Sequence, residues 1–359
     1  MSGLVKCLVW DLDQTLWRGV LLEDGEVELP EEIRAVIVEL DARGILQSVA
    51  SRNDHDKAWA RLAELGIADF FVLPRIGWGR KSDAVREIAD ALGFAYRTIA
   101  FIDDQPAERA EVTHHLPDVR SYPAERATGL PALPEFTPPV VTADAAARRR
   151  RYQAGFRREA ARIAFTGPDE EFLRTLDIVL RLSRATHADI ARLEELTLRT
   201  SQMNATGVHY SEEALRELVT DPGHEVLVAT MTDRFGAHGP VGVLLVGKHP
   251  SVWHLKLLAT SCRVVPFGAG AVLLSWLTDQ AALAGVHLLA DFRKTDRNRM
   301  MEVAYRFAGF AEQPCDCRTT VGHDAGGTQR LHLTPTRQPQ PTTMRVDAPT
   351  LSNDAGRTK

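Results

Sequence analysis

Short apolar segments that end in a polar residue alternate with helical patterns through the first third of the chain, and this alternation most constrains the fold. Residues 4–10 form an apolar run that leads directly into Asp11, as a buried parallel strand does. Two later apolar segments end in the same way, at Ser51 and at Asp103. Strands alternating with helices predict a doubly wound parallel sheet, which binds ligands at the carboxyl ends of its strands. The expected helices are 30–43, 54–65 and 82–92, and the further strands are 45–50, 70–73 and 98–102.

Two carboxylates that follow the first expected strand, Asp11 and Asp13, suit phosphoryl transfer. Asp11 can attack phosphorus to form an aspartyl-phosphate, and Asp13 can protonate the leaving oxygen and later activate water. This chemistry requires a magnesium ion, which Asp11 and the backbone carbonyl of Asp13 can bind. A distal acid completes the expected metal site, and it is supplied by Asp103 and Asp104.

Two further residues, Ser51 and Lys81, complete the expected phosphate-binding set. The Ser51 hydroxyl can donate a hydrogen bond to a phosphoryl oxygen, and Lys81 supplies fixed positive charge. Surface acids at strand ends would explain Asp13 or Asp104 alone, but they explain the ordered set poorly. Asp11 and Ser51 are 40 residues apart, and Ser51 and Lys81 are 30 apart, so neither interval can hold a large cap domain. An uncapped site suits a bulky substrate, such as a group tethered to another protein.

Composition and charge are those of an ordinary soluble globular protein. The chain has 359 residues, which suggests two domains, and its hydrophobic fraction is 44%. A net charge of −5 gives no support for a nucleic-acid or membrane partner. No apolar run reaches the ~18 residues needed to span a bilayer, and the N-terminal segment becomes acidic before a signal peptide could form. We therefore expect a cytoplasmic protein whose four cysteines are thiols rather than a disulfide framework.

A change in composition divides the chain into two parts. Residues 128–142 are rich in proline, and the basic helical stretch after them contains Arg148–Arg151, which we interpret as a solvated helix face. A second α/β pattern begins at Ile178, with expected helices 187–199, 211–219, 268–284 and 297–308 and expected strands 225–230, 241–247, 252–259 and 287–291. The expected organisation is a first domain 1–127, a linker with the basic helix 128–175, a second domain 176–315 and a disordered tail 316–359.

Several motifs together resemble those of a known family. They are DLDQTLWRGV at 11–20, ASRND at 50–54, Lys81, FIDDQPAER at 101–109, RTSQMN at 199–204, WHLKLLATSCRV at 253–264 and RNRMMEVAYRFAGF at 297–310. Over roughly residues 5–312 the chain resembles the FkbH-like family of glyceryl–acyl carrier protein synthases, which act in polyketide pathways and belong to the capless haloacid-dehalogenase superfamily, subfamily IIIC.

The resemblance implies both a fold and an activity. The fold would be a Rossmann-like haloacid-dehalogenase domain without a large cap, which acts as a phosphatase, followed by an acetyltransferase-like (GNAT) α/β domain. The activity would take a glyceryl unit from 1,3-bisphosphoglycerate and hold it as an enzyme thioester. The unit would then be dephosphorylated and moved to the phosphopantetheine thiol of an acyl carrier protein.

Cys262 is the candidate nucleophile of the second domain. It follows an expected strand and precedes a helix, so its thiolate can face a cleft and attack an acyl phosphate. On spacing alone a buried structural cysteine is the commoner explanation, whereas the resemblance favours the nucleophile. His254 would share a face with Cys262 on an ideal strand but lie roughly 26 Å away, so direct pairing requires a bend. Residues 268–270, Gly-Ala-Gly, can expose backbone amides to a pyrophosphate or phosphopantetheine, or form a tight strand–helix turn.

Four further residues are candidates for substrate or carrier contact in the second domain. Asn298 and Tyr305 match positions in the resembling motif. Tyr305 can protonate a leaving thiolate, or it can be a packed helix aromatic. Gln202 and Asn204 can bind a glyceryl or pantetheine amide, or they can be cap and turn residues.

The remaining three cysteines are expected to have no catalytic role. Cys7 points into a buried strand, where a free cysteine packs as a small apolar residue. Cys315 and Cys317 follow the last expected helix without a matching Cys/His pair, so we expect them to be incidental.

Four functions remain open on the sequence, and the first is favoured. A bifunctional enzyme would load a three-carbon acyl unit onto a carrier protein and dephosphorylate it. A stand-alone magnesium-dependent phosphatase would use the second domain only to bind a ligand. A coenzyme A-dependent N-acyltransferase fused to a phosphatase is the third reading. A non-enzymatic scaffold with a degenerate site is the fourth, and the intact set of acids argues against it.

Overall fold

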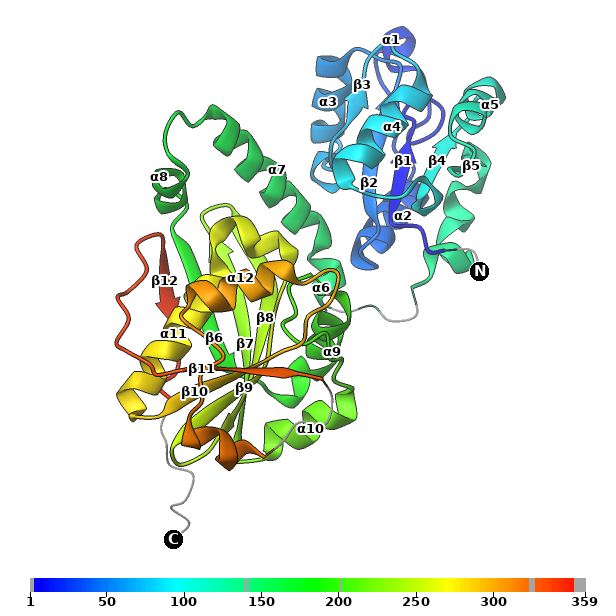
Figure 1. The fold of residues 1–359 in the computed structure, drawn as a ribbon. Coiled ribbons are helices and arrows are strands. Elements are labelled where there is room, and N and C mark those ends of the chain that lie inside the picture. Colours follow the sequence, from blue (N-terminus) through cyan, green and yellow to red (C-terminus); the bar gives the residue numbers. More distant parts are fainter. Residues whose placement is uncertain (1–2, 139–140, 142, 201, 323–326, 352–359) are drawn as a thin grey trace. The chain divides into compact units, whose positions relative to one another are not determined.

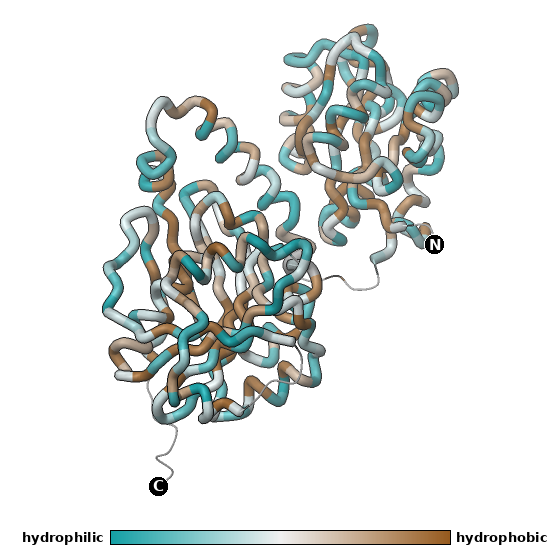
Figure 2. The backbone as a smooth tube through the Cα atoms, viewed as in Figure 1, coloured by the Kyte–Doolittle hydropathy of each residue, from teal (hydrophilic) through white to brown (hydrophobic). Residues whose placement is uncertain are grey.

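The chain forms two compact units, Met1–Arg157 and Arg158–Lys359, which we call unit 1 and unit 2 (Figure 1). The structure is a computed structural model that describes residues 3–138, 141, 143–200, 202–322 and 327–351. Hydrophobic residues gather along the strands inside each unit, and hydrophilic ones gather on the helices around them (Figure 2). None of the described helices is long and apolar enough to cross a membrane.

Unit 1 is built on a five-stranded parallel sheet in the order β3-β2-β1-β4-β5. The strands are β1 (Cys7–Trp10), β2 (Leu46–Ser51), β3 (Arg75–Ile76), β4 (Ile99–Asp103) and β5 (Arg120–Pro123). The helices of eight or more residues are α2 (Glu31–Ala42), α3 (His55–Glu64), α4 (Lys81–Leu92) and α5 (Pro106–His115), and α1 (Leu21–Asp24) is a single turn. The predicted doubly wound parallel sheet is confirmed.

The side chains of β1 show why helices cover both faces of this sheet. Leu8 and Trp10 pack with α2 and α3 on one face, whereas Cys7 and Val9 pack with α4 and α5 on the other. β1 is completely buried between β2 and β4. Its carboxyl end, where Asp11 follows, therefore lies in the middle of the row of strand ends.

Unit 2 is built on a seven-stranded mixed sheet in the order β11-β10-β9-β8-β7-β6-β12. The strands are β6 (Ile178–Arg184), β7 (His224–Asp233), β8 (Gly236–Lys248), β9 (Val252–Thr260), β10 (His287–Phe292), β11 (Gln329–Leu333) and β12 (Met344–Asp347). β6 to β9 are antiparallel neighbours, and β9 and β10 pair in parallel. This is the GNAT-like α/β arrangement expected for the second domain, so the predicted fold class is confirmed.

Helices cover both faces of the unit 2 sheet. α11 (Ala269–Ala284) and α12 (Arg299–Phe307) pack on one face, and α9 (Ile190–Arg199) and α10 (Glu212–Thr220) on the other. Of the remaining helices, α6 (Ala143–Ala146) belongs to unit 1, α7 (Arg148–Ala164) spans the division between the units, and α8 (Asp169–Arg174) belongs to unit 2. Short 3-10 helices occupy Ala68–Phe70, Tyr96–Thr98, Ala124–Ala132, Pro134–Phe136, His187–Asp189, Cys262–Phe267 and Asp316–Val321.

The predicted disorder of residues 316–359 is wrong for the part that the structure describes. β11 pairs with β10 and β12 pairs with β6, so this segment adds the two outermost strands of the sheet. Leu331, Met344 and Leu351 are among the side chains of this segment that are buried. Backbone hydrogen bonds to the sheet do not depend on side-chain polarity, which is why a polar composition misled the prediction.

The division between the units falls within the expected linker of residues 128–175, but not in its proline-rich part. Residues 124–136, rich in proline, form short helices whose Ala127, Leu130 and Phe136 are buried in the core of unit 1. The division instead falls at Arg157–Arg158, inside α7. Proline marks a break in regular structure, but here the segment after the break still has apolar side chains to bury.

Candidate active site

Three charged side chains meet at the carboxyl end of the unit 1 sheet. Lys81 Nζ lies 2.5 Å from Asp11 Oδ1 and 2.7 Å from Asp103 Oδ2. Asp11 follows β1, Asp103 ends β4 and Lys81 begins α4. All three are buried, with at most 5% of each residue exposed. Since buried charges are costly unless they are paired, one cation between two carboxylates is the arrangement that burial permits.

The environment of Asp11 changes its acidity. Burial is the largest influence and raises the pKa of the Asp11 carboxyl to about 6, although the charge and hydrogen bond of Lys81 act to lower it. The nearby Asp103 carboxylate raises it further. A carboxylate that has lost its hydration in this way is a better nucleophile than one in water.

The carboxylates of Asp11, Asp103 and Asp104 could hold a divalent cation. One oxygen from each lies within 4.8 Å of the others. Asp104 Oδ1 is buried and has no hydrogen-bond partner among the described residues. Burial and the charge of Asp103 raise the pKa of Asp104. Hard oxygen donors with excess negative charge fit magnesium, so the residues present suit the predicted ion, with the Asp13 carbonyl remaining a predicted ligand.

The Asp13 carboxylate does not belong to this group of acids and has hydrogen-bond partners of its own. Its Oδ1 accepts hydrogen bonds from Trp17 Nε1 at 2.8 Å and from the Leu21 backbone N–H at 3.1 Å. Its Oδ2 accepts one from Asn53 Nδ2 at 3.0 Å. Gln14 follows with a φ of 54°, a left-handed conformation that few non-glycine residues adopt. Asp13 is thus held by the polypeptide in a position of its own, as a proton-transfer residue separate from the nucleophile must be.

Several residues of this site were not singled out in the sequence, although each lies within a quoted motif. Asn53 belongs to 50–54. Thr15, from 11–20, lies between two acids: its hydroxyl donates to Asp11 Oδ2 at 3.5 Å and accepts from the Asp104 N–H at 2.9 Å. Glu108, from 101–109, has Oε2 at 3.3 Å from Lys81 Nζ. Their positions within the motifs could have pointed to these residues. Their contacts, however, depend on the conformation of loops, which the spacing of residues in the sequence does not predict.

An open, cationic pocket of about 340 Å³ adjoins Lys81. Ser51, Arg52 and Arg80 are among the residues that line it, so the predicted phosphate ligands Ser51 and Lys81 face one space. Arg52 NH1 is 2.8 Å from Glu108 Oε1, which orients the guanidinium. A pocket with this charge suits a phosphorylated group.

In unit 2, Cys262 and His254 are not brought together. Cys262 is exposed at the start of a 3-10 helix, and His254 is buried near the start of β9, with Nε2 at 2.8 Å from Asp291 Oδ1. The β8–β9 register skips Lys256, which is a β-bulge. An extra residue reverses the alternation of side chains, so Leu255 and Leu258 lie on one face. The shared face expected of an ideal strand is therefore lost.

Asn204 and Asn298 connect two loops. Asn298 Nδ2 donates to the backbone carbonyls of Asn204, Ala205 and Arg293 at 2.8–3.3 Å. Asn204 Oδ1 accepts from the backbone N–H groups of Thr206 and Gly207 and from the Thr206 hydroxyl. These contacts match the turn-residue alternative for Asn204. Asn204 also lines a pocket of about 390 Å³, together with Thr197, Leu198, Gly207, His209, Thr295, Asp296 and Arg297.

The other candidates of unit 2 have contrasting positions. Tyr305 is fully buried between Phe292 and Phe310, and burial raises the pKa of its hydroxyl, which matches the packed-aromatic alternative. Gln202 is exposed. Gly268 has a φ of 70° immediately before α11, as a tight turn into a helix requires.

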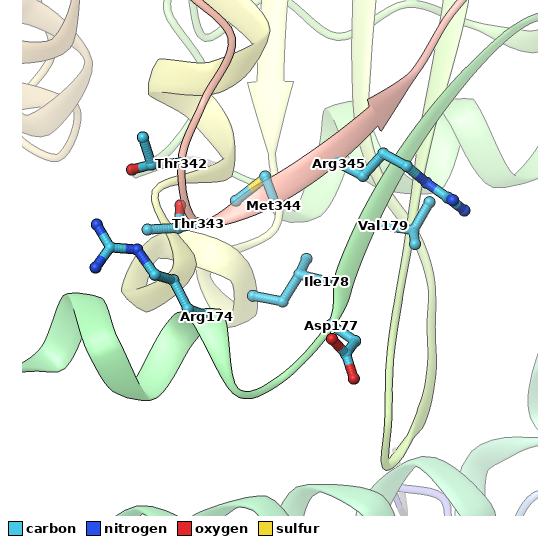
Figure 3. A pocket seen from close by; sticks show the side chains of 8 residues that line it. All are labelled: Arg174, Asp177, Ile178, Val179, Thr342, Thr343, Met344 and Arg345. Atoms are coloured by element: carbon cyan, nitrogen blue, oxygen red, sulfur yellow. The ribbon is translucent and has the colours of Figure 1, made fainter.

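A further pocket of unit 2 lies where α8 meets the strands β6 and β12 (Figure 3). Its volume is about 430 Å³. None of the predicted site residues is among the described residues that line it, which are Arg174, Asp177, Ile178, Val179, Thr342, Thr343, Met344 and Arg345.

The fold and the first site together define a class: an uncapped Rossmann-like domain with a buried lysine between carboxylates at its strand ends, followed by a GNAT-like α/β domain. No protein-family model and no curated protein matches the chain.

Solved structures do resemble parts of the chain. The N-terminal part of the protein BF1531 from Bacteroides fragilis, which contains a phosphatase domain complexed with Mg, is 27% identical over 38% of this chain and 40% of its own length, with a TM-score of 0.34. A protein described as a GNAT-family acetyltransferase from Desulfovibrio desulfuricans is 18% identical over 43% of this chain and 96% of its own, with a TM-score of 0.32. The ribosomal-protein-S18-alanine N-acetyltransferase from Escherichia coli is 15% identical over 45% of this chain and 97% of its own, also with a TM-score of 0.32.

Proposed function

We propose that unit 1 is a magnesium-dependent phosphohydrolase centre of the haloacid-dehalogenase type, with Asp11 as its nucleophile. The observation that carries this proposal is the buried group of Asp11, Lys81 and Asp103. A structural ion pair alone would not need the separately held Asp13 or the cationic pocket beside Lys81. Both are what phosphoryl transfer with an acid–base residue requires.

Each step of the proposed phosphate-ester hydrolysis can be assigned to a side chain of unit 1. Asp11 attacks phosphorus, a P–O bond forms, and the bond to the leaving alkoxide breaks as Asp13 gives that oxygen a proton. Asp13 then takes a proton from water, which attacks the aspartyl-phosphate and releases inorganic phosphate. Lys81 keeps positive charge beside the transferring group. A bound magnesium ion supplies further charge neutralisation.

The openness of the site supports a substrate in which the phosphate ester is attached to a large carrier. Every residue from 11 to 81 is described, and between Asp11 and Lys81 the helices are only α1, α2, α3 and one short turn. Such a site can admit a phosphoglyceryl group on the phosphopantetheine arm of an acyl carrier protein.

Unit 2 would then transfer the acyl group. We propose that the Cys262 thiolate attacks the acyl carbon of 1,3-bisphosphoglycerate, so that a C–S bond forms, the C–O bond to phosphate breaks and inorganic phosphate leaves. The carrier thiolate next displaces Cys262 from this thioester. The exposure of Cys262 supports the step, since an incoming acyl phosphate must reach the sulfur.

Phosphate release tests the first half. The chain with magnesium should release phosphate from phosphoglyceryl carrier protein faster than from free phosphate esters, and the Asp11→Asn variant should release none above background. Full activity of Asp11→Asn would overturn the assignment of unit 1. Efficient turnover of free esters, with no preference for the carrier, would favour a stand-alone phosphatase.

Mass spectrometry tests the second half. The isolated protein given 1,3-bisphosphoglycerate should gain a phosphoglyceryl adduct that Cys262→Ala does not gain. Carrier loading by wild-type protein that never acquires an adduct would show that the Cys262 step is wrong. Calorimetric binding of acetyl-coenzyme A would instead favour an N-acyltransferase, an alternative to which the glycine turn before α11 gives some support.

A further inference from the structure

Four side chains in unit 2 form a second group of metal-ligand type. They are His287 at the start of β10, Cys315 immediately before the 3-10 helix Asp316–Val321, Cys317 within that helix, and His332 in β11. One ligand atom from each lies within 4.8 Å of the other three. The expectation that Cys315 and Cys317 have no matching Cys/His pair is therefore wrong. The matching histidine pair exists, but it lies on two strands that are far apart in sequence.

The register of the sheet explains how these residues meet. β10 and β11 are antiparallel, and Leu289 lies opposite His332. His287 and His332 are therefore diagonal neighbours on one face of the sheet. Their ring centroids are 5.0 Å apart, and His287 Nδ1 is 3.1 Å from His332 Nε2. His287 Nδ1 is also 3.2 Å from Cys315 Sγ.

The surroundings of the group suit a bound ion. Cys317 packs against Val252 and Leu289, so one side of the group is apolar. Arg318 holds the cysteine segment against β11, since its guanidinium donates to the backbone carbonyls of Gln313 and Arg330. Cys317 and His332 are buried, whereas His287 and Cys315 are partly exposed, which leaves a path by which an ion can enter.

We propose that His287, Cys315, Cys317 and His332 bind one Zn²⁺ ion in a tetrahedral site. Two thiolates and two imidazoles are the donor set of structural zinc sites, and soft sulfur donors select against magnesium and calcium. Both thiols lose their protons as the two Zn–S bonds form. With four protein ligands the ion has no open position, so its role is structural: it fastens the cysteine segment and β11 to β10.

Metal analysis of the full-length protein tests the proposal. Protein purified in excess magnesium without chelators should hold one zinc ion per chain. Replacement of the zinc by Co²⁺ should produce the thiolate-to-cobalt charge-transfer absorption and the intense visible bands of a tetrahedral cobalt site. The double variant Cys315→Ser/Cys317→Ser should lose both the zinc and the charge-transfer band.

Two controls separate this site from the others. Cys262→Ser removes an exposed thiol outside the group and should keep the zinc. Asp11→Asn alters the acidic site of unit 1 and should also keep it. Folded wild-type protein that binds neither zinc nor cobalt with thiolate character, or an intact mass showing a Cys315–Cys317 disulfide in place of metal, would overturn the proposal. Because these measurements use the wild-type chain, they decide the question even if the double variant fails to fold.

Discussion

At the scale of single residues, unit 1 keeps the proposed nucleophile Asp11 and the proposed acid–base residue Asp13 in different environments. Asp11 is paired with a buried lysine, whereas Asp13 accepts three hydrogen bonds from a tryptophan, a backbone N–H group and Asn53. Two neighbouring acids can take different roles only if their surroundings differ. Here the difference is built by side chains that do not themselves react.

Replacement of Asn53 tests this positioning. Asn53→Ala removes one hydrogen bond to the Asp13 carboxylate, and a bond of this kind contributes about 1.5–3 kcal/mol. We expect kcat for phosphate release to fall about 10–100-fold with little change in KM, and the pH profile of kcat to shift. Steady-state kinetics across pH would measure both.

The nearby exposed residue His55 provides the control, because His55→Ala leaves the contacts of Asp13 intact. An Asn53→Ala variant with wild-type kcat and an unchanged pH profile would show that Asn53 does not position Asp13.

The acids of unit 1 could be predicted from the sequence because they lie at the ends of two strands, β1 and β4, and the carboxyl ends of parallel strands meet. Residues that are brought together by the pairing register of two strands could not be predicted in this way. His287 and His332 are 45 positions apart, and only the pairing of β10 with β11 reveals that they belong with Cys315 and Cys317. A ligand set that is assembled by antiparallel pairing has no characteristic spacing.

At the scale of elements, a largely buried ion pair within unit 2 holds the part of α7 that begins at Arg158. Arg158 Nε lies 2.5 Å from Asp233 Oδ2 at the end of β7, and His238 Nε2 lies 2.9 Å from the same oxygen. Burial acts to raise the pKa of Asp233, but the hydrogen bonds from His238 and Arg158 outweigh it and hold the pKa well below its usual range. The interpretation of a solvated helix face concerned Arg148–Arg151, and the sequence analysis did not single out Arg158.

This ion pair predicts an acid-dependent stability. A carboxyl group whose pKa is lowered by folding stabilises the protein above its unfolded pKa of about 3.9, and the contribution is lost as the pH falls towards the folded value. Asp233→Asn should therefore cost about 3 kcal/mol at pH 7, since it leaves Arg158 buried without its partner. The loss should shrink below about pH 4.

Chemical denaturation of the two proteins at several pH values would measure this difference. Glu170→Gln is a suitable control, because it alters an exposed ion pair with Arg174, and surface pairs contribute little. A difference between wild type and Asp233→Asn that stays constant from pH 7 to acid would contradict the prediction.

The bulge in β9 shows a second limit on what could be predicted from the sequence at this scale. Alternation along an ideal strand placed His254 and Cys262 on one face, and the sequence carries no mark of the extra residue at Lys256. The existence of β9, by contrast, follows from its apolar run. The composition of a segment predicts that it forms a strand. The face on which each side chain lies depends on the hydrogen-bond register, which a single extra residue changes.

At the scale of the whole molecule, each unit has hydrophobic cores of its own. Chains with independent cores do not unfold in a single two-state transition. We expect calorimetry to resolve two transitions, and we expect magnesium to raise only that of unit 1. A single transition that responds as a whole to magnesium would contradict this expectation.

Matched core variants would assign the two transitions. Leu8→Ala in β1 and Leu258→Ala in β9 each remove a fully buried side chain. Each should cost about 3 kcal/mol and lower the Tm of its own unit by roughly 6–12 °C. The transition of the other unit should stay in place.

The two outermost strands of unit 2 have a consequence for truncated versions of the chain. β11 and β12 cover β10 and β6, whose backbone groups would otherwise be unpaired along the sheet edges. A chain cut after residue 320, at the point where composition alone suggests a dispensable tail, would expose both edges together. We expect that protein to self-associate into insoluble material through strand pairing, whereas the full-length chain stays dispersed. Light scattering of the two preparations at equal concentration would show the difference.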